Sequence, residues 1–80
     1  MNMMNNDTFE TSDLSEITYL LCKDIPLVTT TKLGQRVIFH FGGNDRCRKL
    51  LTDILYGRDM VSLSQALEQV RRARHIMHSI

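Results

Sequence analysis

The sequence predicts a small α+β domain, and three observations support this prediction. Three segments carry apolar residues at helical spacing, and two short segments between the first and second of them are rich in β-branched residues. The length of 80 residues allows one domain. With 42% hydrophobic residues and a formal net charge of +1, the composition is typical of a folded chain. The predicted order is α-β-β-α-α, an antiparallel two-stranded hairpin packed on three helices.

The N-terminal part divides into a predicted tail and a first helix. Residues 1–10 are Asn-rich and show neither helical nor strand periodicity, so we expect an N-terminal tail there and a single domain over residues 11–80. The first helix is predicted over residues 13–23. Ser12 or Asp13 can cap its N-terminus. Its apolar stripe consists of Leu14, Ile17, Leu20 and Leu21.

Two segments predict the hairpin. Residues 27–31 and 36–41 are dense in β-branched and aromatic side chains, and Gly34 between them can take the positive φ that a turn requires. Alternation along the second strand places Val37, Phe39 and Phe41 on one face. It places Ile38 and His40 on the other face. The first face should pack against the helices.

Two more helices are predicted after the hairpin. Asn44 or Asp45 can cap the second helix, and Gly57 suits the position just after its end. Ser62 and Gln65 form a capping box for the third, which keeps its period to the last residue. The residues expected to complete the core with Leu27, Val37, Phe39 and Phe41 are Leu14, Ile17, Leu21, Leu50, Leu51, Ile54, Leu67 and Val70.

The order of these motifs resembles a small uncharacterised family of bacteria, phages and mobile elements, known only as a domain of unknown function. The resemblance extends from Thr11 to about Met77. It is carried by residues 11–14, 19–21, 36–41, 56–58, 61–62 and 66–67. The chain departs from the family pattern at His40 and Ser64. The resemblance implies the fold and a mobile-element context, and it implies no activity.

Catalytic and metal-binding chemistry has little support. His75 and His78 can share a helix face, but a zinc site needs three or four ligands, and the CxxC and HExxH patterns are absent. Cys22 and Cys47 belong to apolar stripes, where cysteine acts as a small hydrophobe. A neighbouring base for either thiol, such as His40 beside Cys47, is not indicated by the sequence. We therefore predict a non-enzyme without catalytic, metal or cofactor residues.

Charge is distributed unevenly along the chain. Residues 1–24 contain five acidic residues and one base, whereas residues 25–80 contain nine bases and four acidic residues. The stretch at residues 71–78 forms a basic stripe on the last helix. This stripe can be a solvated or pairing surface, or it can contact phosphates. The candidate contact residues are Arg46, Arg48, Lys49, Arg71, Arg72, Arg74, His75 and His78.

These features predict a non-enzymatic protein-interaction module, encoded by a phage or mobile element and acting as an accessory subunit or inhibitor. The alternative is a nucleic-acid-associated module that contacts the phosphate backbone through the basic side of the last helix. A protein partner or self-association is expected, since a domain of this size has a small core. No membrane contact and no small-molecule substrate are expected. The longest apolar run is four residues, and only two cysteines are present, so we expect a cytoplasmic protein.

Overall fold

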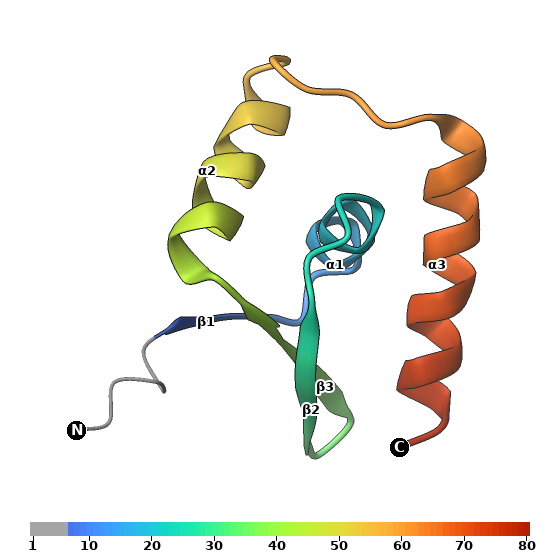
Figure 1. The fold of residues 1–80 in the computed structure, drawn as a ribbon. Coiled ribbons are helices and arrows are strands. Elements are labelled where there is room, and N and C mark those ends of the chain that lie inside the picture. Colours follow the sequence, from blue (N-terminus) through green and yellow to red (C-terminus); the bar gives the residue numbers. More distant parts are fainter. Residues whose placement is uncertain (1–6) are drawn as a thin grey trace.

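The computed structural model describes residues 7–80, and its sheet has three antiparallel strands where the sequence predicted two (Figure 1). The strands are β1 (Thr8–Thr11), β2 (Leu27–Leu33) and β3 (Arg36–Gly42), arranged in the order β1-β3-β2. The α+β class and the hairpin of β2 and β3 are confirmed. The two-stranded sheet was wrong, because β1 adds a strand along the other side of β3.

Three of the four residues of strand β1, residues 8–10, were expected to belong to the N-terminal tail. Phe9 pairs with Phe41, and Thr11 pairs with Phe39, so β1 places one aromatic side chain on the same face as those of β3. A strand of four residues with a single large hydrophobe has almost no signal of its own. Its pairing with β3 depends on residues about thirty positions later. The first six residues of the expected tail lie outside the described residues.

The three helices are α1 (Leu14–Cys22), α2 (Asn44–Leu55) and α3 (Leu63–His78). Asp13 caps α1 as predicted, because its Oδ1 accepts a hydrogen bond of 3.1 Å from the backbone N–H of Glu16. Ser62 caps α3 in the same way through Gln65. The predicted side-chain cap of α2 was wrong. Its N-cap is Gly43, with φ of 82° and no side-chain hydrogen bond.

The core lies between the helices and one face of the sheet. The side chains of Phe39 and Phe41 are fully buried on that face, and their rings stack with centroids 6.3 Å apart. Among the three helices, α1 contributes the most buried residues to this core. The buried hydrophobic residues are Ile17, Tyr19, Leu20, Leu21, Ile25, Val37, Phe39, Phe41, Cys47 and Ala73. The expected packing of the Val37 face against the helices is thus confirmed.

Helix α1 lies between α2 and α3, which run in opposite directions on either side of it (Figure 1). The small residue Ala73 is fully buried in α3, where this helix packs against α1. Five residues predicted for the core are partly buried and pack against it: Leu14, Leu27, Leu50, Leu51 and Ile54. On the flank of α3, Val70 is half-buried and Leu67 is exposed, so the prediction for Leu67 was wrong. Over residues 7–80, no helix is long and apolar enough to cross a membrane.

Candidate interaction surface

A groove lined mainly by apolar side chains lies among the three helices. It consists of two adjoining hollows of about 380 and 340 Å³ that share Ser15, Tyr19 and Ile54. We call it the helix groove. On the side of α2 it is also lined by Glu16, Leu51, Thr52 and Leu55. On the side of α3 it is also lined by Leu14, Thr18, Val61, Ala66 and Val70.

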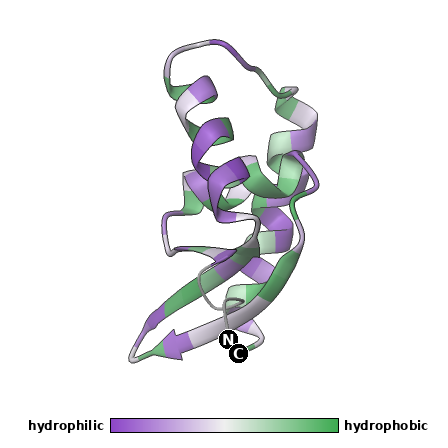
Figure 2. Ribbon diagram, turned by 60° about the vertical axis from the view of Figure 1, so that its left-hand side comes forward, coloured by the Kyte–Doolittle hydropathy of each residue, from purple (hydrophilic) through white to green (hydrophobic). Residues whose placement is uncertain are grey.

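Large hydrophobic side chains are exposed around the end of this groove where α2 is joined to α3. We call them the apolar rim: Leu55, Tyr56, Met60, Leu63 and Leu67. Leu63 is 74% exposed and Met60 is 84% exposed. The ribbon coloured by hydropathy shows hydrophobic positions at both ends of the connecting segment (Figure 2). Single exposed hydrophobes are common, but several exposed hydrophobes beside an apolar groove are typical of a binding surface.

The connecting segment is fastened to α1 through Asp59. Its carboxylate accepts a hydrogen bond of 2.5 Å from the Tyr19 hydroxyl and forms an ion pair of 3.0 Å with Lys23. Arg58 adds a link to α2, because its guanidinium lies 3.2 Å from the Asp53 carboxylate. The walls of the groove are therefore held together, because this segment is bonded to α1 and α2, and α3 packs directly on α1.

The contact between Tyr19 and Asp59 shifts both pKa values in opposite directions. The hydrogen bonds from Tyr19 and Lys23, in that order of importance, lower the pKa of Asp59 to about 2. Burial, followed by the hydrogen bond to Asp59, raises the pKa of Tyr19 well above its usual value. The structure therefore favours a charged carboxylate and a neutral phenol at this site.

These shifts predict a pH dependence of folding that Asp59→Asn should reduce. The pKa of Asp59 is lower in the folded chain than the value of about 3.9 expected when unfolded, so its contribution is complete above about pH 4 and is lost as the pH falls towards 2. The raised pKa of Tyr19 acts at the other end, where stability is lost above about pH 10. Urea unfolding between about pH 2 and 6 measures the acid limb.

The readout is the difference between the original chain and the variant, since other carboxylates titrate in the same range. Asp59→Asn should be less stable at neutral pH and should lose less stability on acidification. Asp45→Asn is the matched control, because Asp45 is exposed on the first turn of α2. If acidification lowered the free energy of unfolding equally in the original chain and in Asp59→Asn, the result would contradict the role assigned to this carboxylate.

The eight predicted contact residues are all exposed, but the structure does not bring them together. The predicted contact residues are divided between α2 and α3, which lie on opposite sides of α1 (Figure 1). On α2, the Arg48 guanidinium lies 5.6 Å from the centre of the Phe9 ring, and Lys49 pairs with Asp53 at 3.3 Å. On α3, no ion pair within residues 7–80 involves an arginine.

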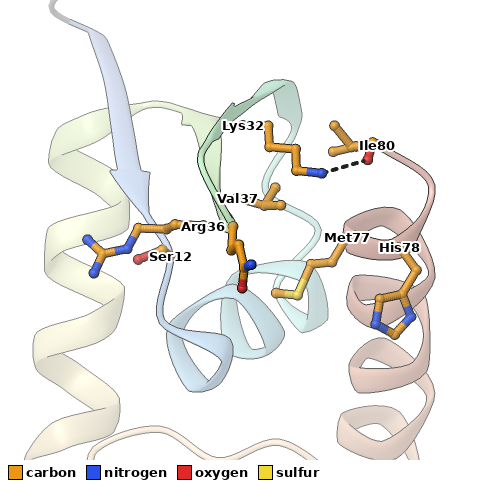
Figure 3. A pocket seen from close by; sticks show the side chains of 8 residues that line it. Ser12, Lys32, Arg36, Val37, Met77, His78 and Ile80 are labelled. Atoms are coloured by element: carbon orange, nitrogen blue, oxygen red, sulfur yellow. Dashed lines mark hydrogen bonds between the residues drawn. The ribbon is translucent and has the colours of Figure 1, made fainter.

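A larger polar hollow of about 840 Å³ lies between the β2–β3 turn and the end of α3 (Figure 3). His78 lines it, together with Lys32 and Arg36. The Lys32 ammonium donates to the backbone oxygen of Ile80 at 3.4 Å, and Figure 3 shows Arg36 extending away from the helix. The cations therefore do not converge on one point, and the hollow lacks the geometry of an anion site.

The cysteines and histidines are placed apart. Cys47 is buried in the core, where its Sγ lies 3.7 Å from the Gly42 carbonyl oxygen, and burial raises the pKa of its thiol. Cys22 is half-buried, and its pKa is also raised, mainly by burial. In the described part of the chain, no three His, Cys, Asp or Glu side chains form a candidate metal site.

His40 lies on the open face of the sheet, away from the core. Its Nε2 is 2.9 Å from the Thr31 hydroxyl, and its Nδ1 is 3.4 Å from a Glu10 carboxylate oxygen. This is the order of groups in an acid–histidine–hydroxyl triad. It was missed because Glu10 was assigned to the tail. The three residues come from three adjacent strands, and they line neither the helix groove nor the polar hollow. We interpret them as a cross-strand polar contact.

Comparison with known proteins adds no further assignment. No family model matches the chain, and neither a curated protein nor a solved structure is found to be similar. The family resemblance therefore stays a prediction. The candidate site rests on the geometry of the helix groove and the apolar rim.

Proposed function

We propose that this chain is a non-enzymatic protein-interaction module that binds its partner through the helix groove and the apolar rim. The observation that carries the proposal is the exposed apolar rim beside a groove whose walls are already fixed. Apolar surface that leaves water on binding contributes roughly 25 cal/mol per Å². A preformed groove reduces the ordering cost of association. These properties suit an accessory subunit or an inhibitor, whose action consists of binding.

Binding to nucleic acid is the weaker candidate. Its support is the exposed set of arginines on α3, which lack ion pairs in the part of the chain that the structure describes. The basic residues of α2 lie on the other side of α1, across the helix groove, so they do not form one continuous basic face with those of α3. Aromatic side chains for base stacking are also few, at 6% of the sequence. A DNA and an RNA probe nevertheless belong in every binding experiment on this protein.

The proposal predicts that Leu63→Ser combined with Leu67→Ser weakens partner binding at least about ten-fold without unfolding the domain. Both side chains are exposed, so their loss should change stability little, whereas a partner seated on the rim would lose two apolar contacts. A photoreactive amino acid at Met60 should crosslink the partner in an extract of the natural source. The crosslinked protein, identified by mass spectrometry and purified, should then bind the original chain at least about ten-fold more tightly than the double variant.

The matched control is Val28→Ser combined with Leu33→Ser, which removes two hydrophobes of similar exposure from β2. This control should bind the partner normally, and a photoreactive group at Thr29 should give no specific adduct. Equal binding by both double variants would contradict the proposed surface. Circular dichroism establishes that each variant is folded.

A further inference from the structure

We propose that the helix groove receives an amphipathic helix whose polar side is acidic. This inference rests on the proposed function, because it names the class of partner for the same surface. It follows from the distribution of charge along the groove walls, from the state of the nearby carboxylates and from the apolar character of the groove.

The α3 wall changes character along its length. Val70 lines the groove from one flank of α3. The same flank carries Leu63, Leu67 and Arg74, because they lie seven residues before, three residues before and four residues after Val70. This flank begins with exposed leucines and ends with an exposed arginine. Arg71, four residues after Leu67, lies beside it. The wall is therefore apolar near the connecting segment and basic towards the sheet.

The α2 wall is also apolar near the connecting segment and basic towards the sheet, although its chain runs in the opposite direction. Leu51 and Leu55 line the groove near the connecting segment, and Arg48 lies three residues before Leu51 on the same side of the helix. Because α2 runs towards that segment and α3 runs away from it, the basic ends of both walls lie near the sheet (Figure 1). A partner that matches this pattern carries apolar residues at one end and acidic residues at the other.

The carboxylates near the groove already have partners. Glu16 lines the groove on the α2 side, and its Oε1 accepts a hydrogen bond of 2.6 Å from Thr11. Asp53 and Asp59 form ion pairs with neighbouring bases. The arginines of α3 have no such pairs among residues 7–80. An acidic partner therefore gains contacts on the α3 wall without displacing an existing ion pair.

A helix suits this groove better than an extended segment. Most polar groups of the lining are already occupied: Glu16, Tyr19 and Thr52 each form a hydrogen bond within the chain. The Thr18 hydroxyl is buried. An extended peptide would leave backbone N–H and C=O groups without partners there, whereas a helix satisfies its own. Docking of an amphipathic helix into a groove between helices is an established mode of peptide recognition.

A second copy of the chain does not supply this occupant. In the described residues, α1 is the only helix within the acidic first part of the sequence, and most of its apolar residues are buried in the core. The apolar rims of two copies could still meet.

The test uses the full chain and two fluorescent peptides of about 18 residues. Both carry Leu at positions i, i+3, i+4 and i+7; one has Glu on its polar side and the other has Lys. At about 50 mM salt, fluorescence anisotropy should show the Glu peptide binding about ten-fold more tightly than the Lys peptide. At about 300 mM salt this difference should shrink.

Two charge reversals on α3 form a matched pair. Arg74→Glu should weaken binding of the Glu peptide about five-fold, because Arg74 lies on the groove flank. Arg72→Glu should change it less than about two-fold, because Arg72 is two residues away, on the opposite flank of the helix. Leu63→Ser with Leu67→Ser should weaken both peptides.

The outcomes separate this inference from the proposed function. Equal affinity for the Glu and Lys peptides, with dependence on Leu63 and Leu67, would overturn the acidic partner and leave the groove as a binding surface. Failure of both peptides would also overturn the inference, while the crosslinking at Met60 still decides the proposed function. Binding of DNA or RNA with equal sensitivity to Arg72→Glu and Arg74→Glu would favour the nucleic-acid candidate instead. A dimer in light scattering that excludes the peptides would assign the groove to a second copy.

Discussion

Phe39→Ala is expected to lower the free energy of unfolding by about 3–5 kcal/mol, because it empties the centre of the core. Phe39 is fully buried in the middle of the sheet, opposite Thr11 of β1 and Thr30 of β2, and it stacks on Phe41. Its removal leaves a cavity between the sheet and α1. A domain of this size has a total free energy of unfolding of roughly 4–12 kcal/mol, so this substitution should remove a large share of its stability. Urea denaturation followed by circular dichroism measures the loss.

Two further variants make this result interpretable. Phe39→Leu retains most of the volume and should stay folded, with a loss of about 1–1.5 kcal/mol. Ile38→Ala changes the adjacent residue, which lies half-buried on the opposite face, and should cost clearly less than Phe39→Ala. Similar losses for Phe39→Ala and Ile38→Ala would show that the two faces of the sheet do not differ in burial.

Local sequence signals were sufficient for the elements that carry their own start and stop residues. Asp13 and Ser62 act as the predicted helix caps. Gly34 and Gly57 have the predicted positive φ, at 63° and 74°. The alternation around Phe39 identified the buried face of β3. Each of these features depends on residues within a few positions of one another, so periodicity and capping rules could predict them.

The candidate site depends on contacts between distant parts of the chain, and the sequence predicted little of it. The period of α3 assigned Leu67 to the core, but the close packing of Ala73 on α1 turns that flank outward. The anchoring of Asp59 by Tyr19 joins residues 40 positions apart. The helix groove forms only after α2 and α3 have been placed around α1, and the sequence could not show which exposed leucines lie beside it. The basic residues of α3 were predicted as contacts, whereas the position of Arg74 on the same flank as Leu63 and Leu67 was not.

Phe9→Ala is expected to cost about 2–3 kcal/mol, which would show that β1 is an integral strand of the sheet. Phe9 is half-buried against the core, pairs with Phe41 and lies under the Arg48 guanidinium. The loss combines part of the usual Phe→Ala cost with a cation–π contact worth about 0.5–1 kcal/mol. Urea unfolding gives the total, and a double-mutant cycle with Arg48→Ala isolates the contact.

The control is Thr8→Ala. Thr8 lies in the same strand, opposite Gly42 and on the open face of the sheet, so its substitution should change the free energy of unfolding by less than about 0.5 kcal/mol. Phe9→Ala should also weaken binding in the helix groove, because Phe9 supports Arg48, and the Gly43 N–H at the start of α2 donates to the Asp7 carbonyl at 2.9 Å. Loss of β1 therefore loosens one wall of the groove as well as the sheet. If Phe9→Ala were as stable as Thr8→Ala, residues 7–10 would behave as part of the tail that the sequence predicted, and α2 would be held by α1 and β3 alone.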